Sequence, residues 1–147
     1  MRNGYSTYCE DIRDEPHNAQ YNLIGVYRGS ITAESFPIIL PKLCVVVSWL
    51  QSADEERLPV DFKVIFVPEK SGDEGLLVLY EDQFPIMNIK STAPLSMVEA
   101  HVRLSPVQIG EPGKIGVRLY RGDEVIKLRA LPLLLSTAAP EATTQAT

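Results

Sequence analysis

The chain has 147 residues, a length typical of one domain, and its 45% hydrophobic and 22% charged residues are ordinary for a globular protein. A net charge of −5 argues against general nucleic-acid binding, because such binding depends on Lys and Arg displacing phosphate counterions. The acidic excess lies in residues 1–98, whereas residues 99–147 carry a small positive charge.

Targeting signals and cysteine usage bear on the compartment. The first six residues run into acidic residues rather than an apolar core, so no signal peptide is predicted, and the longest apolar run, residues 43–50, is too short to span a bilayer. Cys9 and Cys44 are too few for a disulfide framework and are interpreted as buried thiols in a reducing cytoplasm. A bridge between them on neighbouring strands is the alternative, and it would require an oxidising compartment.

Strand patterns recur from the start of the chain to residue 135, and helical periodicity is weak. Residues 8–28 predict two strands joined by a polar turn. A strand over residues 42–51 is apolar on both faces, which favours a central position covered on both sides. One of its faces carries Leu43, Val45, Val47 and Trp49.

The next segments alternate apolar and polar residues, as half-buried strands do. Strands are predicted over residues 59–67, 75–81 and 98–105. At most a single helical turn is predicted within residues 52–57, which have capping-box spacing, and another within residues 95–99. The residues expected to point inward are Val60, Phe62, Val64, Phe66, Ala100, Val102 and Leu104.

A hairpin near the C-terminus is the clearest local pattern. The turn at residues 121–124 contains Gly122, which can adopt a positive φ, and residues 125–135 are expected to return beside residues 114–120. Pro132 is expected at a bend or an edge, because it cannot donate a backbone hydrogen bond. The predicted inward residues are Ile115, Val117, Leu119, Ile126, Leu128 and Ala130.

These elements predict an all-β fold. We expect an antiparallel β-sandwich of about seven to nine short strands, with a small β-barrel as the alternative. Residues 1–135 would form a single domain. Residues 136–147, rich in Ala, Thr and Pro without an aromatic residue, are predicted to be a disordered tail.

Several segments of the chain carry a family resemblance. They are Tyr8–Asp11, Asn22–Tyr27, Phe36–Pro37 and the stretch from Pro112–Ile115 to Gly122. Over about residues 7–135 the chain resembles an uncharacterised bacterial domain family, which is also found in mobile elements. The resemblance implies a compact β domain and assigns no catalytic residue. The chain departs from the family pattern at Asn22, where Ser is usual, and at Ile115, where an aromatic residue is common.

Motifs for metal binding are weak. Residues 10–15 contain four carboxylates, but their spacing matches no EF-hand loop and the required Gly is missing. His17 and Cys9 lack the paired spacing of a zinc site. We therefore predict no metal and no cofactor.

Motifs for catalysis are equally weak. His101, Glu99 and Asp61 would be the members of a hydrolase constellation, yet no nucleophile-elbow motif accompanies them. Residues 110–113 form a turn rather than a phosphate-binding loop. We therefore predict a protein without enzymatic activity or catalytic residues, and no small-molecule substrate is evident.

Two sets of residues are candidates for binding. If the C-terminal strands pair as predicted, a basic face would form that could receive an acidic partner or a phosphate backbone, although a solvated outer sheet face also explains it. Its residues would be His101, Arg103, Lys114, Arg118, Tyr120, Lys127 and Arg129. The second set is apolar and, where exposed, would favour self-association. Its residues are Ile38, Ile39, Leu40, Leu131, Leu133 and Leu135.

The sequence therefore predicts a protein-interaction or assembly module, with a protein partner or a homo-oligomer. Binding of an anionic ligand or a nucleic acid through the basic face is the alternative. No membrane association is expected.

Overall fold

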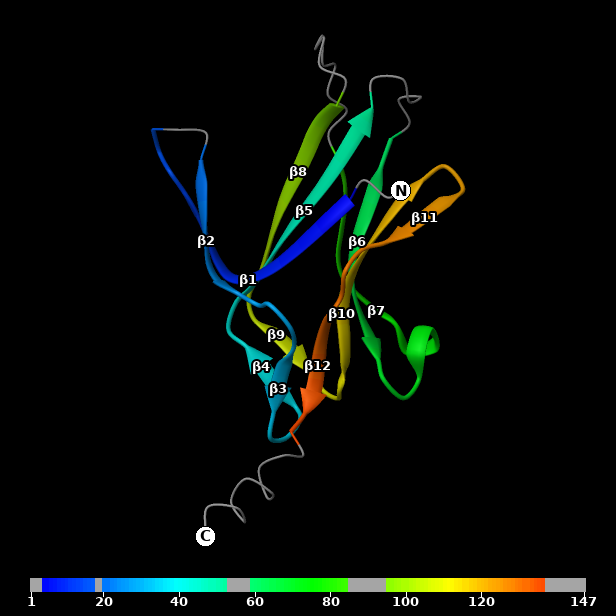
Figure 1. The fold of residues 1–147 in the computed structure, drawn as a ribbon. Coiled ribbons are helices and arrows are strands. Elements are labelled where there is room, and N and C mark those ends of the chain that lie inside the picture. Colours follow the sequence, from blue (N-terminus) through cyan, green and yellow to red (C-terminus); the bar gives the residue numbers. More distant parts are fainter. Residues whose placement is uncertain (1–3, 18–19, 53–58, 85–94, 137–147) are drawn as a thin grey trace.

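The computed structural model describes residues 4–17, 20–52, 59–84 and 95–136. The regular secondary structure of these residues is all β-strand, apart from one 3₁₀ turn, η1 (Gly72–Gly75). They form two packed sheets, which confirms the predicted β-sandwich, and no closed barrel is present in the described part of the chain (Figure 1). No described helix is long and apolar enough to cross a membrane.

Sheet A has four antiparallel strands. In spatial order they are β2 (Tyr21–Val26), β1 (Gly4–Asp14), β5 (Leu43–Ser52) and β8 (Leu95–Leu104). The two strands predicted within residues 8–28 are β1 and β2. The strand predicted over residues 42–51 is β5, and it is central as expected.

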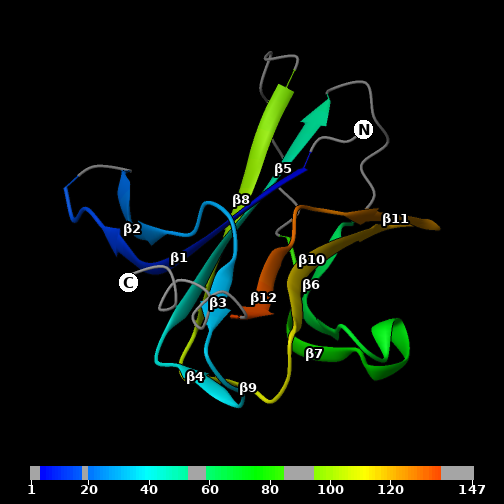
Figure 2. The same ribbon diagram turned by 60° about the horizontal axis from the view of Figure 1, so that its bottom comes forward.

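Sheet B is built mainly from the C-terminal half. In spatial order its strands are β3 (Ile31–Ala33), β12 (Leu131–Leu135), β10 (Gly113–Arg121), β6 (Asp61–Pro68) and β7 (Leu77–Gln83), with β11 (Glu124–Lys127) also paired to β10. All these pairs are antiparallel except β3 with β12. A two-stranded ribbon of β4 (Ile38–Leu40) and β9 (Val107–Ile109) lies at one end of the two layers (Figure 2).

The core lies between the two sheets and follows the predicted alternation. Sheet A contributes one face of β5 and the matching residues of β8, while sheet B contributes the alternate residues of β6, β10 and β12. The fully or almost fully buried core residues include Tyr8, Leu43, Val45, Val47, Trp49, Phe62, Val64, Phe66, Val102, Ile115, Val117, Leu119, Leu131 and Leu133.

The outer face of sheet A is partly covered by the β1–β2 hairpin. Strand β1 pairs with β5 only as far as Cys9 and pairs with β2 beyond that residue. Ile12 and the half-buried Leu23 then pack on the outward side chains Cys44 and Val46. Both faces of β5 are therefore covered near its start, as its apolar pattern predicted.

Two local expectations were wrong. Residues 95–99 begin strand β8 instead of forming a helical turn. The return after the hairpin is split into β11 and β12, so Ala130 lies near Gly116 on the outer side of sheet B, and its inward position is not confirmed. The expectation for Pro132 holds locally: it pairs with Lys114 of β10, whereas β3 pairs with β12 only from Leu133 onward, so no β3 residue lies opposite Pro132.

The ends of the predicted domain are only partly described. Ser136 donates its backbone N–H to the carbonyl of Ala33 at 2.7 Å. The predicted helical turn after Ser52 falls largely in residues 53–58, and the predicted tail falls in residues 137–147; both lie outside the described residues.

Candidate functional site

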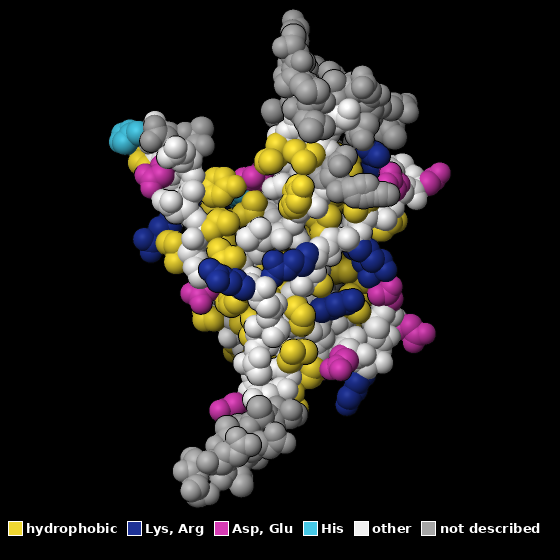
Figure 3. Space-filling view, in the orientation of Figure 1, with side chains coloured by type: hydrophobic (Ala, Val, Ile, Leu, Met, Phe, Trp, Pro, Cys, Tyr) yellow, Lys and Arg dark blue, Asp and Glu magenta, His cyan; other side chains and the backbone are white. Residues whose placement is uncertain are grey.

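A row of cations crosses the outer face of sheet B. Arg118 on β10 lies directly opposite Lys63 on β6 and directly opposite Lys127 on β11. Lys and Arg side chains form a band across the middle of the molecule in Figure 3. Three like charges in register on adjacent strands repel one another, so this row favours the approach of an anion.

The row is only partly neutralised by nearby carboxylates. Arg118 donates to Asp73 Oδ1 at 2.9 Å, and this hydrogen bond lowers the pKa of Asp73, to which the charges of Lys127 and Lys114 also contribute. The carboxylate of Asp73 thus interacts with three cations, Arg118, Lys127 and Lys114. Lys63 lies opposite Glu81 in register, and its Nζ is 5.1 Å from the centre of the Tyr120 ring.

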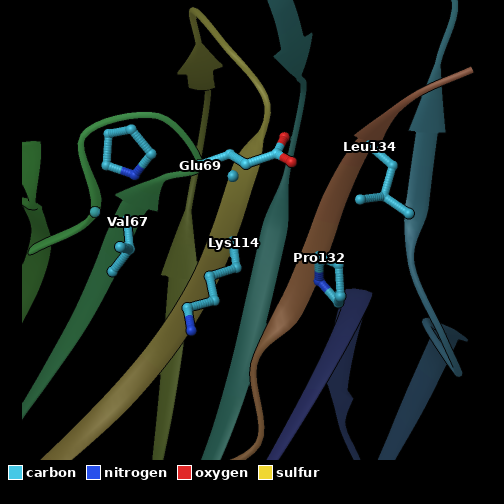
Figure 4. A pocket seen from close by; sticks show the side chains of 8 residues that line it. Val67, Glu69, Lys114, Pro132 and Leu134 are labelled. Carbon is cyan, nitrogen blue, oxygen red and sulfur yellow. The ribbon is translucent and has the colours of Figure 1, made fainter.

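A pocket of about 360 Å³ lies beside this row, on the same face of sheet B (Figure 4). Its walls come from the end of β6, the loop that contains η1, and strands β10 and β12. Lys114 and Glu69 are its charged residues, and most of the other side chains are apolar. The lining residues are Val67, Pro68, Glu69, Gly72, Gly113, Lys114, Pro132 and Leu134.

The floor of the pocket depends on Gly113. A Cβ at this position would lie 2.3 Å from the carbonyl oxygen of Val67 and 2.8 Å from the ring of Phe66. The absence of a side chain therefore allows β10 to approach β6 closely where the pocket forms. Pro132 and Leu134 project from β12 on the far side (Figure 4).

The predicted basic face is not a single surface, which corrects that expectation. His101 and Arg103 lie on β8 in sheet A, whereas Lys114, Arg118, Tyr120 and Lys127 lie in sheet B. The inner faces of the two sheets pack against each other, so their outer faces point in opposite directions. Local alternation identified the outward residues correctly but not the sheet to which each strand belongs.

Arg129 also has a different role from the one predicted. Its guanidinium donates to the backbone carbonyls of Tyr27 and Arg28, at 3.1 and 3.0 Å. Its own carbonyl accepts hydrogen bonds from the hydroxyls of Ser6 and Tyr8, at 2.8 and 2.6 Å. Arg129, in the link between β11 and β12, therefore ties this link to β1 and to the segment after β2, and its charge is directed at backbone oxygens.

On sheet A, a carboxylate network anchors the β1–β2 hairpin. Glu99 contacts His101 Nε2 at 2.6 Å, accepts from the Ser48 hydroxyl at 3.4 Å and is hydrogen-bonded to Tyr21. The Tyr21 ring meets the His101 ring edge-on, with centroids 4.5 Å apart. Arg103 adds an ion pair with Asp14 at 3.1 Å. Asp61, the third residue considered with His101 and Glu99, lies on sheet B.

This network predicts a pH-dependent contribution to stability. Burial works to raise the pKa of Glu99, but the hydrogen bonds from His101, Tyr21 and Ser48 outweigh it and lower that pKa. A carboxyl group with a lowered folded pKa stabilises the fold above its unfolded pKa, and this stabilisation is lost as the pH falls through the folded pKa.

We expect Glu99→Gln to reduce the free energy of unfolding at pH 7 by about 1–3 kcal/mol, because charge-assisted hydrogen bonds are lost. The difference from the wild type should shrink as the pH falls through the lowered pKa of Glu99, because the carboxyl group of the wild type is then protonated. Urea unfolding at a series of pH values measures it. A difference that is equal at all pH values would contradict a role for the charged carboxylate.

The predicted apolar set is also divided. Leu131 and Leu133 are fully buried in the core, and Ile38 and Leu40 are half-buried against it, so the set does not form one exposed surface. Only Ile39 and Leu135 are largely exposed, at 63% and 48%. The alternation within β4 and β12 directs the remaining members inward, which corrects the expectation for Leu131 and Leu133.

The two cysteines lie directly opposite each other on β1 and β5, and both are buried free thiols. Burial raises the pKa of Cys9 to about 11, with the neighbouring Cys44 adding to the shift, and burial also raises the pKa of Cys44. His17, in the turn after β1, is exposed, whereas Cys9 is fully buried. Among the described residues, no group of three His, Cys, Asp or Glu side chains is arranged to hold a metal ion.

We expect both thiols to resist alkylation by iodoacetamide in the native protein at pH 7.5, because the thiolate is the reacting species. In urea, both should react within minutes at the rate of free cysteine. Intact mass measurement counts the alkylated thiols. Rapid labelling of either cysteine under native conditions would show that the hairpin opens readily.

Sequence reasoning missed Lys63, Asp73 and the pocket. The alternation of residues 60–66 places Lys63 outward, so its exposure was predictable. Its neighbours were not, because pairing of β6 with both β10 and β7 is a non-local property. Asp73 and Glu69 lie in a loop whose sequence has no periodic signal.

Comparison with known proteins supports the predicted resemblance. No curated protein and no solved structure matches the chain. A family model described as a family of unknown function (DUF6941) matches residues 4–134, which is nearly the whole of the described fold. The chain therefore belongs to this family of unknown function, DUF6941.

Proposed function

We propose that this domain is a non-enzymatic protein-interaction module that binds an acidic segment of another protein on the outer face of sheet B. The observation that carries the proposal is the row formed by Lys63, Arg118 and Lys127 in direct register. Carboxylates of the partner would relieve the repulsion within this row. Since the whole chain is acidic, the row is also the place to which an acidic partner would be steered.

The pocket beside the basic row supports a partner segment that has both apolar and acidic side chains. Its walls at Val67, Pro132 and Leu134 offer apolar contact, and Lys114 stands between the pocket and the basic row. A segment with one large apolar side chain followed by Asp or Glu residues would fill both parts. Buried apolar anchors provide most of the affinity of such contacts, and the charges provide specificity and association rate.

We also propose that the protein is a bacterial protein of the cytoplasm. Two cysteines that face each other as free thiols are in keeping with a reducing cytoplasm. The resemblance found in the sequence also implies a bacterial origin and an association with mobile elements.

The proposal is tested with a fluorescein-labelled peptide that carries one leucine among Glu and Asp residues. We expect saturable binding by fluorescence anisotropy that weakens with added salt. The double variant Lys63→Gln/Lys127→Gln should bind at least about tenfold more weakly, a loss of about 1.4 kcal/mol. The matched control, Arg28→Gln/Arg103→Gln, removes the same charge from outside the basic row and should bind normally.

Two outcomes would overturn this assignment. Equal binding by both double variants would show that the basic row is not the site. Binding of a single-stranded RNA of similar charge, but not of the peptide, would favour the nucleic-acid alternative.

Self-association is the second candidate, supported by the exposure of Ile39, Leu134 and Leu135. A homo-oligomer held by these residues should keep its mass when salt is raised, since apolar contacts are not screened. Light scattering at low and high salt measures the mass. A monomer under both conditions would reject self-association and leave the acidic-partner proposal standing.

A further inference from the structure

A second pocket, of about 450 Å³, lies away from the basic row. It opens between the β1–β2 hairpin and the chain that enters β5. Ile24, Tyr27, Leu40 and Pro41 form its apolar walls. Four charged residues, Glu10, Asp11, Arg13 and Lys42, also line it. Its volume lies in the range of small-molecule sites.

The two cations in this pocket, Lys42 and Arg13, share the carboxylate of Asp11. Lys42 Nζ contacts Asp11 Oδ1, and Arg13 Nε lies 3.5 Å from Asp11 Oδ2. Asp11 Oδ1 also accepts a hydrogen bond from the backbone N–H of Ile12 at 2.9 Å. The contact with Lys42 lowers the pKa of Asp11, which therefore remains ionised. One carboxylate shared by two cations leaves one positive charge without a counterion.

The opposite charge is supplied by Glu10. No hydrogen bond or ion pair of its carboxylate is found among the described residues. The side chain lies against Gly25, where a Cβ would be 2.8 Å from Glu10 Cδ and 2.9 Å from Oε2. Gly25 also has a positive φ of 67°, so the backbone and the space at this position both favour glycine. Glycine at position 25 thus allows the Glu10 carboxyl to lie at the edge of the pocket.

Tyr27 lines the pocket close to the charge of Glu10 and contributes both an aromatic ring and a hydroxyl group. Burial and then the nearby charge of Glu10 raise the pKa of Tyr27, so its hydroxyl stays protonated. The pocket therefore combines an unpaired carboxylate and a protonated phenol with an excess cation and apolar walls.

We propose that this pocket binds a small zwitterion, namely a free α-amino acid with an apolar side chain. The ammonium group would pair with Glu10, the carboxylate would pair with the Lys42–Arg13 pair of cations, and the side chain would contact Ile24 and Leu40. The carboxylate of Glu10 would repel a simple anion, and the cation without a counterion would repel a simple amine. Only a ligand with both charges satisfies both groups.

L-Leucine and its two halves provide matched probes. 3-Methylbutylamine keeps the ammonium group and the side chain, and 4-methylpentanoate keeps the carboxylate and the side chain. In NMR titrations of the full chain, leucine should produce saturable shifts of the amides around residues 10–13, 24–27 and 40–42. Each half should bind at least about tenfold more weakly.

The charge of Glu10 is tested by Glu10→Gln, which keeps the shape of the side chain. We expect a loss of leucine affinity of at least about tenfold with an unchanged melting temperature, because Glu10 is exposed and unpaired. Glu111→Gln, which removes one negative charge from the exposed turn before β10, is the control and should bind normally.

Three results would overturn the proposal. These are the absence of saturable shifts with leucine, equal binding of leucine and either half, and unchanged leucine binding by Glu10→Gln. The site shares no residue with the basic row or its pocket, so these results are independent of the peptide experiment.

Discussion

Replacing Trp49 by alanine is expected to lower the free energy of unfolding by about 3–5 kcal/mol. Trp49 is only 2% exposed, on the inner face of β5, where it lies opposite Val98 of β8. The guanidinium of Arg121 lies 5.2 Å from its ring centre, so one end of the core is closed by a cation over an aromatic face. Alanine would leave a cavity bounded by both sheets, which cannot collapse without separating their pairing partners.

Two further variants identify the cause of this loss. Trp49 Nε1 is buried without a hydrogen-bond partner among the described residues, so Trp49→Phe keeps most of the packing and removes an unsatisfied donor. It should cost much less than alanine. Met97→Ala, at an outward position that is 55% exposed on β8, should change stability by no more than about 0.5 kcal/mol.

The measurement is urea unfolding followed by circular dichroism, because the two Trp49 variants lack the single tryptophan that fluorescence would report. An unchanged transition midpoint for Trp49→Ala would mean that the inner and outer faces of β5 are reversed. An equal loss for Trp49→Phe and Trp49→Ala would instead assign the effect to the Arg121 contact or to the indole group alone.

Replacing Gly113 by alanine is expected to cost about 3 kcal/mol, the upper part of the usual range for overpacking. The new methyl group would lie 2.3 Å from the carbonyl oxygen of Val67, a backbone atom that is fixed by the β6–β10 ladder. The ring of Phe66 blocks the other direction at 2.8 Å. Because φ of Gly113 is not positive, the loss would come from steric overlap and not from a strained dihedral angle.

Gly110 provides a matched control in the same connection. A Cβ there would meet no atom within 4 Å, and its φ is not positive. Gly110→Ala should therefore change stability by at most about 0.5 kcal/mol, as expected for an exposed substitution. Thermal and urea unfolding of both variants measure the difference. Similar stabilities would contradict the close approach of β10 to β6 that forms the pocket floor.

The elements that local sequence predicted well are those whose signal lies within the element. In β5, alternation placed Val45 and Val47 inward, and the apolar second face correctly indicated a cover on the outer side. The turn at Gly122 was predicted because glycine can adopt a positive φ, and in the structure its φ is 58°. These features need no knowledge of which strands are neighbours.

What could not be predicted depends on partners distant in sequence. Arg103 and Arg118 have the same local pattern, yet they face opposite sides because β8 and β10 belong to different sheets. Strands β3, β4 and β9 contain three residues each, too few for a period to be recognised. Both pockets are formed where a loop or a hairpin meets a strand that is distant in sequence, so their residues show no common spacing.

The hydrogen bond from Tyr8 to the carbonyl of Arg129 joins residues that are 121 positions apart, and β12 supplies Leu131 and Leu133 to the core. Consequently, during synthesis the N-terminal strands emerge well before the segment that completes their hydrogen bonds. Until then the space for Leu131 and Leu133 is unfilled and the inner faces of β1, β6 and β10 are incompletely covered. The nascent chain therefore passes through a period in which apolar strands are available to chaperones or to one another. Folding of this family's domain should finish only after translation has passed residue 135, at the slow rates typical of folds dominated by non-local pairing.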